Sequence, residues 1–151
     1  IALMREDYPG AREFLTSATG DDDDPGYNQN EVMIMTMAAL ATDKVGQAEE
    51  AAAMLVEAER KINRARLNGV DDPSIYYSEA VLLSMRSEPA RAMEKLREAY
   101  DRGYREQWVL EIDGRLGPLR EDPEFIMLMD QIRDDVSRAL TEIRSLPLAS
   151  L

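Results

Sequence analysis

The stretch DPSIYYSEAVLLSMRSEPARAMEKLREAYDRGY, residues 72–104, decides the fold. Its Ser87-Glu88-Pro89 segment interrupts any helix, because proline suits the first turn of a helix and disfavours helical backbone in the residue before it. On either side of this break, small residues at Ala80 and Ala92 allow two helix backbones to approach closely, and larger side chains fill the space around them. The stretch therefore predicts two short antiparallel helices joined by a tight turn. The six packing positions are Tyr76, Ala80, Leu83, Ala92, Leu96 and Ala99.

The spacing of these six residues resembles the tetratricopeptide repeat (TPR) family, whose repeats are helical hairpins that stack side by side. Residues 32–69 carry the same pattern, and residues 1–18 resemble the second half of a partial repeat. The resemblance implies an all-α fold, a TPR-like α-α superhelix built as a solenoid of helical hairpins. The corresponding alanines lie further apart than the ~34 residues of a regular array, so we expect longer helices or looser linkers. The matching positions are Met35, Ala39, Thr42, Ala51, Leu55 and Ala58 in one repeat, and Ala11, Leu15 and Ala18 in the partial one.

Residues 19–31 are interpreted as an acidic linker that follows the partial repeat. The four consecutive aspartates at 21–24 repel one another, and the Pro-Gly pair that follows them interrupts any helix. A calcium-binding EF-hand loop would need alternating oxygen ligands and a closing Glu at its twelfth position. A loop that starts at Asp21 instead places Pro25 at a ligand position and Val32 at the closing one, and the next register fails in the same way. We therefore expect a solvated linker and no metal site.

Residues 105–121 are expected to form an irregular segment, because two glycines and a proline leave no room for a regular second helix. The run WVLEIDGRLGPLREDPEFIMLM, which begins at Trp108, resembles the irregular ending found on many bacterial TPR arrays. In those endings a Trp, an Asp and a Pro-Leu-Arg segment precede an Asp-Pro-x-Phe helix start; this chain departs from the pattern at Asp113-Gly114, where Asp-Pro is common. The resemblance implies the C-terminal TPR portion of a bacterial multidomain regulator, such as an adenylate cyclase or a winged-helix transcription regulator. The chain also begins at Ile1 in the middle of a repeat pattern, so we expect a fragment of a longer polypeptide.

The last predicted helix spans residues 122–147, with Asp122 as its N-cap and Pro123 in its first turn. Its apolar residues recur at alternating intervals of four and three, which is a heptad pattern about three heptads long. Two interpretations stay open: a capping helix that covers the end of the solenoid, and the seam of a homodimer. A heptad pattern this short favours the capping helix. In that case the part of the helix beyond Val136 would extend past the surface it covers, and dimerisation would occur there. The heptad positions are Phe125, Met129, Ile132, Val136, Ala139, Ile143 and Leu146.

The composition of the 151 residues, which suit a single domain over 1–151, argues against an enzyme. The chain has no histidine and no cysteine, so it lacks the commonest general base, the commonest metal ligand and any thiolate nucleophile. Neither a Gly-x-x-x-x-Gly-Lys-Ser/Thr nor a Gly-x-Gly-x-x-Gly motif is present to bind phosphate groups. We therefore predict no catalytic residues and no cofactor.

Charge and hydropathy narrow the choice of partner. The formal net charge of −12 argues against nucleic acid, because phosphate binding requires clustered Lys and Arg, and it favours basic partners through electrostatic steering. The longest apolar run is far shorter than the ~20 residues that cross a bilayer, so no membrane association is expected. The absence of cysteine fits a reducing compartment, and we expect a cytoplasmic protein.

In TPR arrays the first helix of each repeat lines a concave face that binds partners. Carried over to this chain, the resemblance places apolar and aromatic side chains on that face, which would suit a partner helix or an extended peptide. The basic clamp of chaperone-binding TPR proteins would need Lys, Arg and Asn there, and only Lys44 is available. Because adjacent helical residues cannot share a face, one of Tyr76 and Tyr77 should point outward. The predicted groove consists of Met33, Thr36, Leu40, Lys44, Ser74, Tyr77, Val81, Met85 and Trp108.

We therefore predict a non-enzymatic protein–protein interaction module from a bacterial regulatory or signalling protein, with a protein or peptide as its partner. One alternative is a small-molecule sensor domain that relays a shift to an output domain outside this chain. The other is a homodimerisation module that associates through the C-terminal helix. A closed apolar pocket with a few inward polar groups would favour the sensor, whereas an open groove would favour peptide binding.

Overall fold

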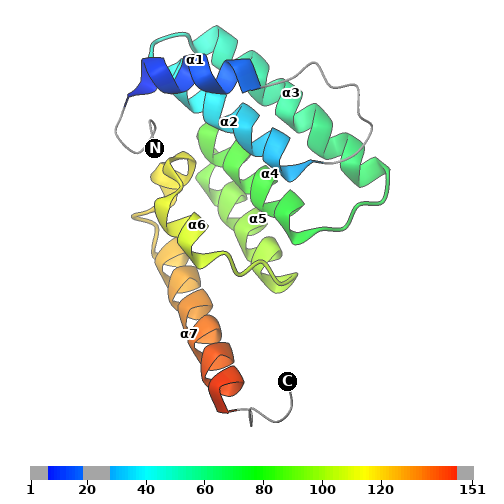
Figure 1. Cartoon of the computed structure of the whole chain (residues 1–151), viewed down its shortest axis with the longest axis vertical. Helices are drawn as coiled ribbons and strands as arrows, with labels where there is room; N and C mark the ends of the chain where they lie inside the picture. Colours follow the sequence, from blue (N-terminus) through cyan, green and yellow to red (C-terminus); the bar gives the residue numbers. More distant parts are fainter. Residues whose placement is uncertain (1–6, 19–27, 146–151) are drawn as a thin grey trace.

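The computed structural model describes residues 7–18 and 28–145, which contain helices and turns but no strand (Figure 1). The all-α prediction is therefore confirmed. Residues 19–27 of the predicted linker, Leu146 of the heptad pattern and the side chain of Ala18 lie outside the described residues. In chain order the elements are α1 (Tyr8–Ala18), α2 (Gln29–Lys44), α3 (Ala48–Leu67), α4 (Pro73–Met85), α5 (Pro89–Asp101), α6 (Gln107–Ile112), the 3-10 helix η2 (Gly114–Leu119) and α7 (Pro123–Ser145).

Consecutive helices pack as pairs, α2 with α3 and α4 with α5, and α1 packs against α2 (Figure 1). Small residues permit this close packing. Ala80 and Ala92, which were expected to lie where the α4 and α5 backbones approach, are both fully buried. Ala11 of α1 is buried in one cluster with Ala38 and Ala41 of α2. The alternation of small and large side chains in the sequence thus predicted which helix surfaces are buried.

The same turn geometry ends each of the helices α2 to α5. The residue after the C-cap has a positive φ, and its N–H and the next N–H donate to carbonyls of the last helical turn, as in a Schellman motif. Glycine occupies this position at Gly46, Gly69 and Gly103, where a positive φ costs no steric clash. At the turn between α4 and α5 the position is taken by Ser87, with φ 60°. This turn therefore has the required geometry but not the preferred residue.

Helix α4 lies at the centre of the molecule and is buried on nearly all sides, because it contacts α2, α3, α5 and η2. This position makes one expectation wrong: neither of the adjacent tyrosines points outward, and Tyr76 and Tyr77 are 6% and 4% exposed. Tyr76 packs against three cationic side chains from the region of α3 and α5. The Tyr77 ring instead stacks on Tyr104, with ring centroids 4.8 Å apart. A helix with neighbours on several faces can bury two adjacent residues against different partners.

Only the first half of α7 packs against the rest of the molecule. Phe125, Leu128, Met129 and Ile132 are buried, and the helix contacts α5 and α6. Residues 137–145 are all exposed, and this half of the helix extends away from the other elements (Figure 1). The heptad pattern is therefore used for packing in its first half only. None of the helices within residues 7–18 and 28–145 is both long and apolar enough to cross a membrane.

Candidate partner-binding pocket

The 3-10 helix η2 packs onto α4 and α2, within the face that was predicted to bind a partner. Its sequence GRLGPL contains two glycines and a proline, which disfavour an α-helix. Asp113 starts the turn, because its Oδ1 accepts a hydrogen bond from the backbone N–H of Arg115 at 2.9 Å. Leu116 and Leu119 are fully buried. The segment is therefore part of the core and not a loose connection.

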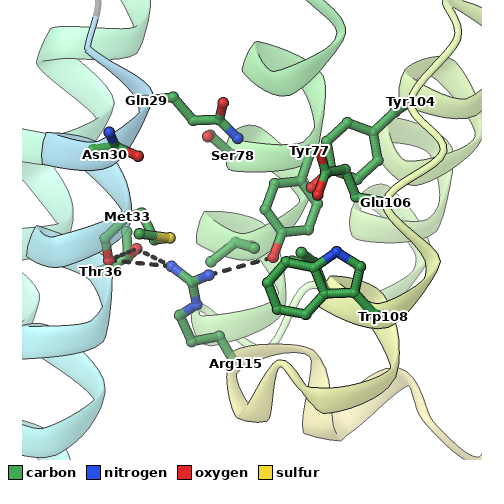
Figure 2. A pocket seen from close by; sticks show the side chains of 12 residues that line it. Gln29, Asn30, Met33, Thr36, Tyr77, Ser78, Tyr104, Glu106, Trp108 and Arg115 are labelled. Atoms are coloured by element: carbon green, nitrogen blue, oxygen red, sulfur yellow. Dashed lines mark hydrogen bonds between the residues drawn. The ribbon is translucent and has the colours of Figure 1, made fainter.

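The Arg115 side chain is held by all five of its N–H donors. Figure 2 shows its hydrogen bonds to Thr36 and Tyr77. Nε and Nη2 donate to the two carboxylate oxygens of Asp113 at 2.8 and 2.6 Å, which is a bidentate ion pair. Nη2 also donates to the Tyr77 hydroxyl at 3.3 Å. Nη1 donates to Thr36 Oγ1 at 2.5 Å and to the backbone carbonyl of Met33 at 3.3 Å. Arg115 is 3% exposed and has no donor left for a ligand.

The two ionisable side chains that contact the Arg115 guanidinium, Asp113 and Tyr77, have pKa values shifted away from pH 7. Burial acts to raise the pKa of Asp113, but hydrogen bonds and the charge of Arg115 outweigh it, and the pKa of that carboxyl is lowered. Burial raises the pKa of the Tyr77 hydroxyl, which also donates a hydrogen bond to Asp113. Neither group titrates near pH 7, where a general acid or base works best. The network is suited to holding η2 in place.

This insertion divides the predicted groove. Leu40 lies beside η2, since a Cβ built on Gly114 would be 3.8 Å from its Cδ2. Lys44 is exposed at the C-terminal end of α2, Ser74 is buried in the first turn of α4, and Met85 packs against the core. These four residues do not line the pocket that remains. The other five predicted residues, Met33, Thr36, Tyr77, Val81 and Trp108, do line it.

The remaining pocket has a volume of about 270 Å³ and opens between α2, α4 and α6 (Figure 2). We call Thr36, Tyr77 and Arg115 its floor, because the buried network joins them. Four of the lining residues are exposed to solvent, and we call them its rim: Gln29, Asn30, Glu106 and Trp108. The pocket is lined by Gln29, Asn30, Met33, Thr36, Tyr77, Ser78, Val81, Tyr104, Glu106, Trp108, Val109 and Arg115.

The rim carries polar side chains that have no partner within the described part of the chain. Within the described part of the chain the Glu106 carboxylate makes no ion pair, and the side-chain amides of Gln29 and Asn30 make no hydrogen bond. The neighbouring Arg105 is directed elsewhere, since its guanidinium lies 3.9 Å from the Tyr100 ring centroid and pairs with an aspartate of α7. The rim therefore presents an unpaired carboxylate and two amides beside an exposed indole.

Sequence reasoning missed most of the rim. Gln29 and Asn30 fell in the predicted linker, although Asn28 is an N-cap residue whose side chain accepts from the N–H groups of Asn30 and Glu31. That cap signal could have placed the start of α2 correctly. Glu106 and Arg115 carried no comparable local signal, because their role depends on contacts with α2 and α4 that are distant in sequence.

No group of three or more acidic side chains that could hold a metal ion occurs in residues 7–18 and 28–145. Comparison of the chain with family models, with curated proteins and with solved structures gives no match.

Proposed function

We propose that this chain is a non-enzymatic, TPR-like protein–protein interaction module that holds a peptide or helix of a partner in the pocket between α2, α4 and α6. The observation that carries the proposal is Trp108, which is 63% exposed at the pocket rim. An indole of this size has a large apolar surface to bury, and tryptophan is among the residues that contribute most to binding at protein interfaces. The resemblance of residues 108–129 to bacterial TPR endings extends the proposal to a regulatory or signalling protein.

The buried charges support a binding role over catalysis. Asp113, Arg115 and Tyr77 are the most deeply placed ionisable groups of the pocket, and each is engaged with the others. The pKa of Asp113 is lowered and that of Tyr77 is raised, so both shifts lead away from neutral pH. The pocket volume of about 270 Å³ is slightly below the range of ~300–1,000 Å³ typical of small-molecule sites, which favours a segment of a partner over a sensed metabolite.

A peptide selection tests this proposal. A library of random twelve-residue peptides is selected on the native chain and counter-selected on Trp108→Ala. Ile112→Ala is the matched control, since Ile112 is also exposed on α6 but does not line the pocket. We expect enriched peptides that bind the native chain and Ile112→Ala equally and bind Trp108→Ala at least about tenfold more weakly. Peptides that bind all three proteins equally, or no enrichment at all, would contradict the proposal.

A second function, homodimerisation through α7, is favoured by one observation. Leu140 and Ile143 are 47% and 64% exposed on the second half of α7, where residues 137–145 are all exposed. Sedimentation velocity of the native chain and of Ile143→Glu distinguishes the two cases. A dimer that dissociates in the variant supports this second function, whereas a monomer at all concentrations contradicts it.

A further inference from the structure

We propose that the pocket receives the side chain of an arginine from the partner. This inference rests on the proposed function and specifies the chemistry of the same site. It starts from the carboxylate of Glu106, which makes no ion pair with the residues that the structure describes and lies at the rim next to Trp108 (Figure 2). A carboxylate beside an aromatic ring is the combination that attracts a cation, because the carboxylate supplies charge and the ring face supplies a negative quadrupole.

The charges at the floor do not oppose a cation. Arg115 is neutralised by its bidentate pair with Asp113, and all its N–H donors point at protein acceptors. The N-terminal end of α2 would otherwise present free N–H groups and a partial positive charge. There the Asn28 side chain accepts from two of these N–H groups, and Glu31 supplies a negative charge in the first turn. Glu106 is therefore the charge that a ligand meets first, in a chain whose net charge is −12.

The arrangement favours arginine over lysine. A guanidinium group is planar, stacks on aromatic faces and carries five donors, whereas an ammonium group is a compact, strongly hydrated charge. The pocket offers an exposed indole at Trp108 and the stacked rings of Tyr77 and Tyr104. It also offers several separate acceptors, namely the Glu106 carboxylate and the amide oxygens of Gln29 and Asn30. A guanidinium can donate from its edge to several acceptors while its planar face stacks on a ring, whereas an ammonium group has no planar face to stack.

The experiment uses the peptides that bind the native chain but not Trp108→Ala. One such peptide is synthesised with its arginine, with citrulline, which has the same shape without the charge, and with lysine. Binding is followed through the indole N–H resonance of Trp108, which is unambiguous because the chain has one tryptophan. We expect the citrulline peptide to bind at least about tenfold more weakly than the arginine peptide and the lysine peptide at least about threefold more weakly.

Two variants locate the charge on the protein. Glu106→Gln removes the rim carboxylate, and Glu94→Gln removes the same charge from an exposed position on α5 that does not line the pocket. We expect Glu106→Gln to weaken the arginine peptide about tenfold and the citrulline peptide less than twofold. Glu94→Gln should leave both affinities within twofold.

The outcomes separate this inference from the proposed function. Selected peptides that depend on Trp108 but contain no arginine, or equal affinities for arginine and citrulline, would overturn the arginine assignment and leave peptide binding intact. Lysine that binds as tightly as arginine, or a Glu106→Gln variant with unchanged affinity, would overturn it as well. If no selected peptide depends on Trp108, the proposed function fails together with the inference.

Discussion

Replacing Arg115 by methionine tests the central claim about how η2 is held. Methionine is similar in length to the arginine stem and fills space adaptably, so the change removes the guanidinium while it leaves little cavity. It takes away five hydrogen bonds and the only cation that pairs with the Asp113 carboxylate among the described residues. Asp113 is 7% exposed, so its carboxylate would remain in the interior without a counter-ion.

The expected cost follows from that unpaired charge. Removing one partner of a buried ion pair typically costs about 3–5 kcal/mol, because the other charge stays buried. Arg115→Lys keeps the charge but cannot make the bidentate, five-donor arrangement, and we expect it to cost about 1–2 kcal/mol. In the double variant Asp113→Asn/Arg115→Met no buried charge remains, and the asparagine oxygen can still accept from the backbone N–H at position 115. The double variant should therefore be more stable than Arg115→Met alone, by about 2 kcal/mol.

Urea unfolding followed by circular dichroism measures these differences. With a urea dependence of about 2 kcal/mol/M, a loss of 3–5 kcal/mol lowers the midpoint by about 2 M. Arg115→Lys provides a measurable value if the methionine variant does not fold. A cost below about 1 kcal/mol for Arg115→Met, or a double variant that is less stable than the single one, would show that the buried network does not hold η2.

Four further predictions follow from other parts of the structure. Ser87→Gly should raise the free energy of unfolding by about 1 kcal/mol, because φ 60° strains a residue with a Cβ, and Ser87→Ala should give no such gain in thermal melting. Stability should fall as the pH rises above 10.0, because burial raises the pKa of Tyr77 and the unfolded chain ionises first; Tyr77→Phe should reduce this slope in urea midpoints measured against pH. Stability should also fall as the pH drops below 3.8. Burial acts to raise the pKa of Asp113, but the contacts with Arg115 outweigh it and lower that pKa, so Asp113 is protonated in the unfolded chain before it is protonated in the folded one. Deleting residues 138–151 should change the melting temperature by less than about 2 °C, because the described part of that segment is exposed, whereas Ile132→Ala should cost about 2–5 kcal/mol.

The sequence predicted the helices and their buried surfaces well, because those depend on local spacing. The expected break at Ser87-Glu88-Pro89 lies between α4 and α5, and Pro123 begins α7 as its sequence signals indicated. The failure at Tyr76 and Tyr77 also had a signal. Helix α4 contains a single charged residue, Glu79, and so lacks the polar face that an exposed helix surface needs.

The shape of the proposed binding face could not be predicted in the same way. Arg115 forms hydrogen bonds with Thr36, which lies 79 residues earlier in the chain. No periodicity connects positions so far apart, and an arginine in a glycine- and proline-rich segment is ordinarily expected at the surface. The insertion of η2 into the groove is thus a tertiary effect, and it decided which of the predicted groove residues remain available.

The division between the pocket floor and its rim has a consequence for how this protein can acquire a new partner. Thr36, Tyr77 and Arg115 belong to the buried network and also line the proposed binding pocket, so substitutions among them should change stability together with affinity. Gln29, Asn30 and Trp108 hold nothing else in place within the described chain, and their side chains can be exchanged at little energetic cost. A change of partner, in the laboratory or through natural variation, should therefore arise from substitutions at the rim while the residues of the floor stay the same.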